Sequence, residues 1–183
     1  MTLYPSRARR RDSVYRTVTR LLAFGSAPIA ALVAPGRARH TACQWALKMR
    51  FPAEDLSGLT PATRAAFEAA RTRALWQHGE LLGLTCGYRD AATQAALYAA
   101  EVRRAGSEQA ARRWVLPPHD SRHVAGMALD VRPTEGARWL EEHGAPYGLY
   151  RRYDNEWWHF EFCAEGRPAR LAHPGIAFAD CPS

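Results

Sequence analysis

The chain has 183 residues, of which 47% are hydrophobic and 23% are charged, and its formal net charge is +7. This length suits one domain with a hydrophobic core, and the composition excludes a large multidomain enzyme and a disordered or collagen-like chain. The first 40 residues contain eight arginines and one acidic residue, which leaves 17 basic and 17 acidic residues in the rest. The body of the protein is therefore electroneutral, which argues against nucleic-acid binding.

The N-terminal segment has the pattern of a secretory signal. Arginines precede a largely apolar run of 13 residues, Leu21–Val33, and small residues follow it. The run is short for a membrane-spanning helix and contains Gly25 and Pro28. We expect residues 1–43 to be an export signal or a membrane-proximal segment and residues 44–183 to form the functional domain in the cell envelope, outside the cytoplasm. A disordered N-terminus is the alternative.

The four cysteines fit an oxidising compartment. Cys43, Cys86, Cys163 and Cys181 allow three disulfide pairings, and the sequence does not choose among them. None of them has the CxxC spacing of a cysteine-based zinc finger or a thioredoxin-like site. Residues 40–43 partly resemble a lipoprotein cleavage box, so a lipid anchor on Cys43 is a further possibility.

From residue 60 onward the sequence predicts a mixture of helices and strands. Thr60 can cap a helix that starts at Pro61 and ends near His78, and residues 82–88 predict a short buried strand. The other predicted elements are a helix over residues 91–105 capped by Asp90, a short helix over 108–114, a strand over 127–131, a helix over 133–143 and a strand over 157–162. This order without βαβ repetition favours the α+β class.

Two histidines and an aspartate form a candidate metal site. His123, Asp130 and His159 are a donor set that suits zinc at a catalytic centre with a fourth position open to water. An offset of seven residues along a straight strand would put His123 and Asp130 on opposite faces. We therefore expect Gly126 to bend the chain between them.

Glu156 is a candidate base, because it precedes His159 by three residues and a zinc-activated water needs a group that takes its proton. Each residue alone has an ordinary explanation, such as a packed histidine or a surface pair between Asp130 and Arg132. The combined pattern is more specific. Ser-x-His-x-x-Gly-x-Ala-x-Asp matches by chance at roughly one start site in a million, and a Glu-x-x-His follows it.

The segments SRHVAGMALD and EWWHFEF resemble the two zinc motifs of the zinc D-alanyl-D-alanine carboxypeptidase family typified by VanY, with dipeptidase relatives typified by VanX. CGYRDAATQ resembles the Tyr-Arg segment of that family, and the resemblance covers about residues 60–163. It implies a small α+β fold, shared with the hedgehog signalling domain. In that fold a small antiparallel sheet, packed with helices, carries one zinc ion.

Carried over by motif position, the resemblance implies that His123, Asp130 and His159 hold the zinc and that Glu156 is the catalytic base. Arg89 would stabilise the carbonyl oxygen or hold the substrate. The implied substrate-binding residues are Ser121, Gln94 and Tyr88.

The implied reaction is hydrolysis of the D-Ala-D-Ala bond in a peptidoglycan stem peptide. We expect a monomer that binds no nucleic acid and meets the membrane only through its N-terminal segment. Trp157 after the glutamate is closer to the dipeptidase form, whereas the spacing after Asp130 is closer to carboxypeptidases. A dipeptidase, a peptidoglycan endopeptidase and a non-catalytic zinc-dependent binding module are the alternatives. The presence of both Glu156 and Arg89 argues against the last.

Three further features lack a motif assignment. Glu161 would share a strand face with His159, where it can orient a ligand or be a solvated edge residue. The segment between Arg89 and Ser121 contains Trp114 and can form a lid or a rim. Three histidines match no motif position and are expected at the surface, namely His119, His143 and His173.

Overall fold

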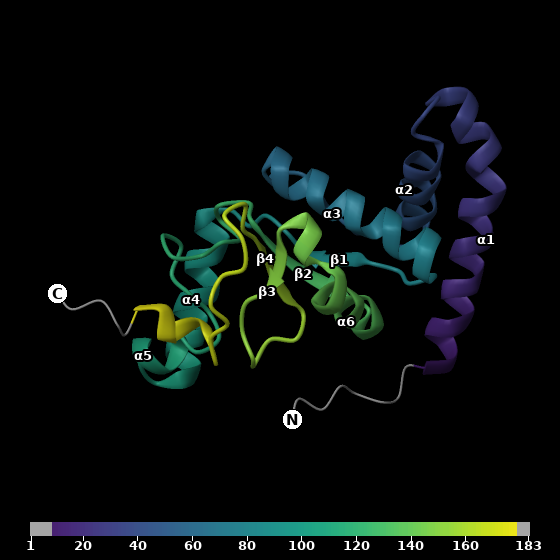
Figure 1. Ribbon diagram of the computed structural model, residues 1–183. Helices are drawn as coiled ribbons and strands as arrows, with labels where there is room; N and C mark the ends of the chain where they lie inside the picture. The colour runs from purple at the N-terminus through teal and green to yellow at the C-terminus, as the bar shows by residue number, and fades with distance from the viewer. Residues whose placement is uncertain (1–8, 179–183) are drawn as a thin grey trace.

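The computed structural model describes residues 9–178. Its centre is an antiparallel sheet of four strands in the order β1-β2-β4-β3 (Figure 1). The strands are β1 (Gly83–Cys86), β2 (Ala128–Arg132), β3 (Leu149–Arg151) and β4 (His159–Phe162). This arrangement confirms the predicted α+β class, although the three-residue strand β3 was not predicted.

The main core lies against one face of this sheet. Leu129 on β2 pairs with Phe160 on β4, and both side chains are completely buried. Helix α3 (Pro61–Arg73) contributes Phe67 and helix α6 (Thr134–His143) contributes Leu140 to the same cluster. Burying one such side chain contributes roughly 1.5–3 kcal/mol. Because strand residues alternate between faces, the neighbours of these core residues point to the opposite face.

The predicted helices begin and end where their capping residues indicate. Helix α4 (Ala91–Ala105) starts after Asp90, whose side chain accepts a hydrogen bond from the Thr93 backbone, and it ends at Gly106. The helix predicted over residues 61–78 is α3 followed by one wider turn, η1 (Ala74–His78). Helix α5 (Glu108–Ala111) is shorter than the predicted 108–114. The remaining short turns are η2 (Ala145–Tyr147) and η3 (Pro174–Phe178).

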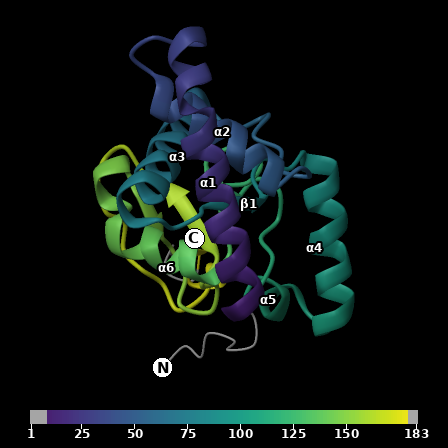
Figure 2. The same ribbon diagram turned by 90° about the vertical axis from the view of Figure 1, so that its right-hand side faces the viewer.

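The N-terminal helices α1 (Arg9–Val33) and α2 (Ala38–Arg50) pack against each other at one side of the domain (Figures 1 and 2). Helix α1 continues through Gly25 and Pro28, the two residues that interrupt the apolar run. Both residues are exposed, so water can satisfy the carbonyl that Pro28 leaves without a partner. Helix α2 was not predicted.

A second core cluster joins this hairpin to the domain. Ala23 of α1 packs with Leu47 of α2 and with Leu75 of η1, and all three are buried. Cys43, Cys86 and Cys163 are free thiols, and Cys181 lies outside the described residues. Within residues 9–178, no helix combines the length and apolarity needed to cross a bilayer.

Candidate active site

Sheet register places three potential metal ligands in one row. Asp130 on β2 pairs with Cys86 on β1 and with His159 on β4. An irregularity in β1 between Leu84 and Cys86 adjusts the register at this point. The row faces away from the main core, because the neighbouring pair Leu129 and Phe160 points into it. The polar side chains therefore gather on the one sheet face that the core leaves available.

His123 reaches this row from a loop. Its Nδ1 lies 2.6 Å from the carbonyl oxygen of Gly87, and a carbonyl can only accept, so Nδ1 carries the proton. The remaining nitrogen, Nε2, lies 3.5 Å from Oδ1 of Asp130. Gly126 has a φ of 67°, and a Cβ there would lie 2.4 Å from the carbonyl oxygen of Gly58. The predicted bend between His123 and Asp130 is confirmed.

His159 completes a set of three donors. Its Nδ1 lies 3.2 Å from Oδ1 of Asp130, and its Nε2 lies 3.3 Å from Oε1 of Glu161. Each of the two imidazoles therefore has one nitrogen toward Asp130 and the other toward an acceptor, which is the arrangement that orients histidine ligands in metal sites. The structure brings together His123, Asp130 and His159, the three predicted ligands.

The charges of these groups depend on one another. Burial lowers the pKa of His123, but hydrogen bonds to Asp130 and Cys86 outweigh it and raise the value to about 9. For His159 the bonds to Asp130 and Glu161 outweigh burial in the same way and raise the pKa to about 10. Burial raises the pKa of Asp130, yet the two imidazoles hold it well below its usual range. The acidic partners therefore favour the protonated form of both imidazoles.

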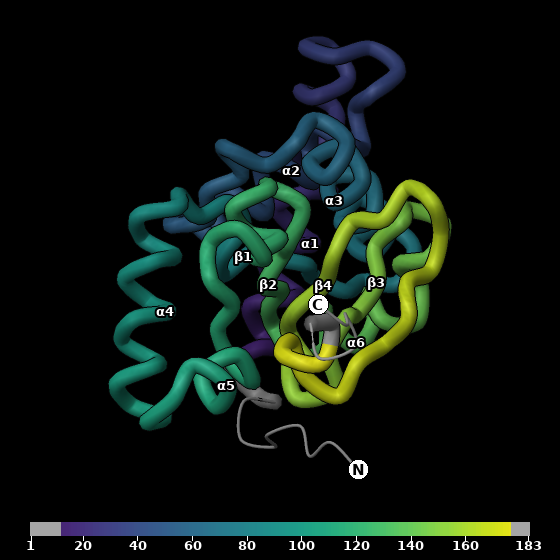
Figure 3. Tube along the Cα trace, turned by 90° about the vertical axis from the view of Figure 1, so that its left-hand side faces the viewer, coloured from purple at the N-terminus to yellow at the C-terminus, as the bar shows by residue number. Residues whose placement is uncertain are grey.

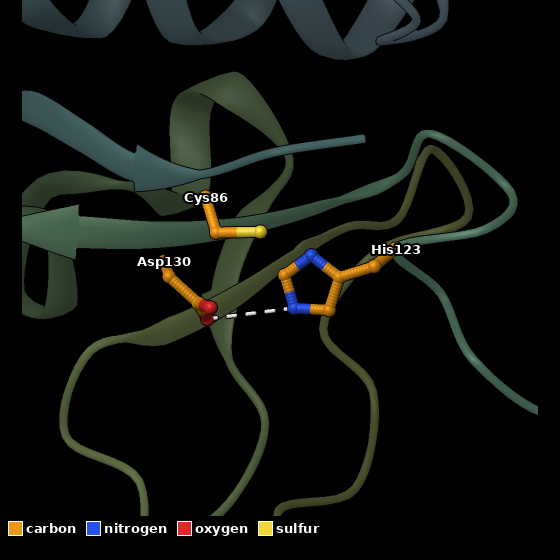
Figure 4. Close-up of side chains that lie close together, drawn as sticks. All are labelled: Cys86, His123 and Asp130. Carbon is orange, nitrogen blue, oxygen red and sulfur yellow. Dashed lines mark ion pairs between the residues drawn. The ribbon is translucent and has the colours of Figure 1, made fainter. Parts of the chain in front are cut away.

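Cys86 is a fourth donor that the sequence analysis missed. One ligand atom each of Cys86, His123 and Asp130 lies within 4.8 Å of the others. Figure 4 shows the three side chains gathered at one point. The Sγ of Cys86 also lies 3.1 Å from Nη2 of Arg89, which donates to it. Its position directly before Gly87-Tyr88-Arg89, inside the strand predicted over residues 82–88, was the available signal. The chain therefore offers two candidate donor sets that share His123 and Asp130. The third donor is His159 in one set and Cys86 in the other.

Glu156 lies at the edge of the same cluster. It is 7% exposed, and its Oε2 lies 3.7 Å from Nδ1 of His159. Burial, together with the negative charge of Asp130, outweighs the nearby imidazoles and raises the pKa of Glu156 to about 7. A carboxyl with this pKa can both accept and release a proton near neutral pH.

The loop that carries Glu156 is held by a buried arginine. Arg151 donates from Nε to the carbonyl oxygens of Tyr153 (3.1 Å) and Glu156 (3.3 Å), and from Nη2 to that of Asp154 (2.9 Å). Its Nη1 lies 3.0 Å from Oε2 of Glu141 on α6. Nothing in the sequence motifs indicates this role, because Arg151 touches only backbone atoms of the loop.

Arg89 is fixed from two sides. Its Nη1 donates to Oε1 of Gln94 at 2.5 Å, and its Nη2 donates to Cys86. Gln94 is buried and in turn donates from Nε2 to the carbonyl oxygen of Leu116 at 2.6 Å. Gln94 therefore connects Arg89 to the segment between α5 and His123, which forms one wall of the site.

A cleft of about 290 Å³ contains these groups. Its lining includes both candidate ligand histidines and also Trp114 and Trp158. Five more predicted site residues line it, namely Arg89, Gln94, Ser121, Asp130 and Glu156. Trp114 is 48% exposed at its rim, as expected for a rim segment. Figure 3 shows the segment around α5 below the central strands β2 and β4 of the sheet. Tyr88 does not line this cleft; its ring covers Gly58 instead.

Glu161 is a buried orienting group rather than a solvated edge residue. It is 4% exposed, and besides His159 it meets the Tyr153 hydroxyl at 3.3 Å, while its Oε2 lies 3.6 Å from Nε of Arg152. Of the three histidines predicted at the surface, His119 is exposed, whereas His143 and His173 are partly buried. The ring of His143 stacks on Trp139.

Taken with the fold, a cleft with clustered imidazole and carboxylate donors, a buried glutamate and an arginine defines a candidate metal-dependent hydrolase site. The comparison with known families is more specific. Residues 57–165 match the family model "VanY: D-alanyl-D-alanine carboxypeptidase", so the chain belongs to this family. The matched range contains every candidate ligand, the glutamate and the arginine discussed above.

Individual relatives are more distant. A D-alanyl-D-alanine carboxypeptidase of Enterococcus faecalis is 28% identical over 87 residues, which cover 38% of this chain and 32% of that protein. The chain thus spans about one third of the length of this curated relative. Among solved structures, an LdcB LD-carboxypeptidase has a TM-score of 0.48 with 23% identity over 57% of this chain and 58% of the other. A VanY mutant in complex with Zn(II) has a TM-score of 0.47 with 26% identity over 60% and 76%.

Proposed function

We propose that this protein is a zinc-dependent D-alanyl-D-alanine carboxypeptidase that hydrolyses the terminal D-Ala-D-Ala bond of peptidoglycan stem peptides. The observation that carries the proposal is the buried carboxyl of Glu156, 3.7 Å from Nδ1 of His159, in a cleft shared with Arg89. A site that only held a metal would need neither Glu156 nor Arg89. Membership in the carboxypeptidase family supports the same reaction.

The donor chemistry fits one zinc ion. His123, Asp130 and His159 would hold it, because Nε2 of His123 and Nδ1 of His159 both face Oδ1 of Asp130 while their other nitrogens are engaged by Gly87 and Glu161. When bound, zinc polarises a carbonyl and lowers the pKa of water. Cys86 is left to accept the hydrogen bond from Arg89.

Glu156 performs the proton transfers. Its carboxylate takes a proton from water as the water oxygen attacks the carbonyl carbon of the scissile peptide bond. The same carboxyl then gives that proton to the nitrogen of the departing D-Ala as the carbon–nitrogen bond breaks. Burial raises the pKa of Glu156 to about 7, which suits a group that must act as base and then as acid. No other proton carrier is needed to balance the reaction.

Arg89 supplies donors at the other side of the cleft. Its guanidinium is held by Gln94 and Cys86, so its direction is fixed before substrate arrives. A planar fork of donors suits either the oxygen that becomes negative during attack or the terminal carboxylate of the substrate. Ser121 lines the same cleft and is proposed to contact the peptide.

The proposed location is the cell envelope, outside the cytoplasm, where stem peptides occur. The arginine-rich start and the apolar run Leu21–Val33 support export or attachment to the membrane through the N-terminal segment. We propose that the protein acts as a monomer. We propose no nucleic-acid partner, because the electroneutral body carries no excess basic charge.

The test is to incubate the zinc-loaded protein with muramyl pentapeptide, muramyl tetrapeptide and free D-Ala-D-Ala, and to identify the products by mass spectrometry. We expect loss of the terminal D-Ala from the pentapeptide. Cleavage of the free dipeptide alone would indicate a dipeptidase, and an internal cut would indicate an endopeptidase. If all substrates stay intact at high enzyme concentration while zinc is bound, the protein is a binding module and the proposal is wrong.

A further inference from the structure

Helix α1 presents its large apolar side chains to solvent. Nine of them are exposed, and three of the nine, Tyr15, Phe24 and Val33, lie to either side of the rest. The other six share one side of the helix, and they are Val14, Val18, Leu21, Leu22, Ile29 and Leu32. Leu21 is 65% exposed and Leu32 is 84% exposed. This spacing places them on one stripe of an α-helix. We call these six residues the outer stripe.

The opposite side of α1 is built from small residues. Thr19, Ala23 and Ala30 are buried, and Ala23 belongs to the second core cluster. A helix that served only to cover the domain would place its large apolar residues inward and its polar ones outward. Helix α1 instead buries small residues and exposes most of its large apolar ones, so a further apolar surface would have to cover the outer stripe.

Three contacts fix the rotation of α1 on the domain. Nη1 of Arg16 lies 2.7 Å from Oε1 of Glu80, and the ring of Phe24 meets Trp76 edge to face at 4.6 Å between ring centroids. The guanidinium of Arg50 on α2 lies over the ring of Tyr15 at 4.3 Å. These contacts hold the helix so that the outer stripe cannot turn inward. Removal of residues up to 42 would also uncover the buried Leu47 and Leu75.

The charge of the N-terminal sequence favours one covering surface. Residues 1–53 contain ten basic residues and one acid, Asp12. A second copy of this chain would bring two such basic segments together, which like-charge repulsion disfavours. A bilayer with anionic headgroups instead offers hydrocarbon for the stripe and negative charge for the arginines.

We propose that α1 lies in the plane of an anionic membrane, with the outer stripe in the headgroup boundary and the packed face holding the peptidase domain against it. Helices α4 and α5 lie on the far side of the sheet from α1 (Figure 1). Because the cleft is lined by residues of α4 and of the segment after α5, it would open away from the membrane. The inference does not depend on the proposed peptidase activity.

The experiment is sedimentation of the full chain with vesicles of phosphatidylcholine, alone or mixed with phosphatidylglycerol. We expect binding to the mixed vesicles that weakens as salt is raised and little binding to phosphatidylcholine alone. The variant Leu21→Glu/Ile29→Glu places two charges on the stripe. The control Thr17→Glu/Ala31→Glu adds the same charges at exposed positions of α1 outside it. We expect the stripe variant to bind at least about tenfold more weakly than the control.

The milder pair Leu21→Ser/Ile29→Ser tests the same contact if the charged variant does not fold, as judged by circular dichroism. Equal binding of stripe and control variants would overturn the proposal. Absence of binding to anionic vesicles would do so too. A dimer in analytical ultracentrifugation that disappears in the stripe variant, without vesicle binding, would identify a second copy as the true occupant.

Discussion

The site face of the sheet and the outer stripe of α1 depart from the usual distribution of side chains in opposite ways. On the sheet, ionisable groups such as His159 and Glu161 are buried, and each has charged or hydrogen-bonding partners. On α1, large apolar groups such as Leu21 and Leu32 are exposed. Buried charge and exposed apolar surface both carry a free-energy cost. Both regions are therefore candidate binding surfaces, the sheet for a metal and a substrate and α1 for an apolar surface.

The two regions differ in how fully the fold determines them. Cross-strand pairing sets the positions of Asp130 and His159, and hydrogen bonds then set the direction of each imidazole. The outer stripe needs no such precision, because lipid contact depends on apolar area rather than on atom positions. Substitutions should therefore act sharply and individually on the sheet and weakly on α1.

The largest effect is expected at the proposed base. Glu156→Gln keeps the size and burial of the side chain but removes its ability to take a proton, so kcat should fall by roughly 10²–10⁴-fold. Zinc content, measured by atomic absorption, should stay at one ion per chain. Equal turnover by the variant and the wild type would remove Glu156 from the reaction.

A smaller effect, on zinc affinity, is expected at Glu161, which contacts the candidate ligand His159. Glu161→Gln weakens the acceptor at Nε2 of His159, so zinc affinity should fall by roughly 10–100-fold in a competition titration with a chelator. Cys86→Ser is the matched control, because it changes the other donor set and should alter zinc affinity much less. The reverse ranking of the two variants would mean that Cys86 is a ligand.

The sequence predicted the site better than it predicted the surroundings. Helix α4 was predicted with its observed ends because Asp90 and Gly106 are local capping signals. The three candidate ligands stood out because two short motifs carry them, His123 and Asp130 in one and His159 in the other. Cys86 and Arg151 were missed because sheet register and loop contacts determine their roles, and neither is visible in a single segment.

The N-terminal region was predicted less well for a physical reason. Helix α2 has no side-chain cap, and its buried residues Ala46 and Leu47 show their role only against α1 and η1. The apolar run of α1 was recognised, but its packed face of small residues has no periodic apolar signal. The sequence alone therefore could not show that α1 packs on the domain.

Arg151→Lys tests whether the loop of Glu156 needs its buried support. Lysine keeps the charge toward Glu141 but cannot reach three carbonyl oxygens at once, so kcat should fall about tenfold with little change in zinc affinity. Arg170→Lys is the control, since Arg170 reaches the same Glu141 from a more exposed position. An unchanged kcat for Arg151→Lys would show that the loop of Glu156 keeps its conformation without the hydrogen bonds from Arg151.

The smallest effect concerns stability and pH. Burial opposes ionisation of Glu141, but its hydrogen bonds to Arg170 and Arg151 dominate and lower its pKa. A lowered pKa in the folded state gives stability that is present above the unfolded pKa and is lost as pH falls through the folded value. Glu141→Gln should therefore cost about 1 kcal/mol near neutral pH and progressively less below about pH 4.5. Urea unfolding of both proteins across this range measures the difference, and a gap that widened in acid would contradict it.

The most direct measurement is X-ray absorption at the zinc edge of the loaded wild-type protein. Ligation by His123, Asp130 and His159 predicts nitrogen and oxygen neighbours at about 2.0–2.2 Å and no sulfur. The spectrum of Cys86→Ser should be identical. A sulfur neighbour at about 2.3 Å that disappears in Cys86→Ser would contradict the account, because the metal would then be held by the other set of donors.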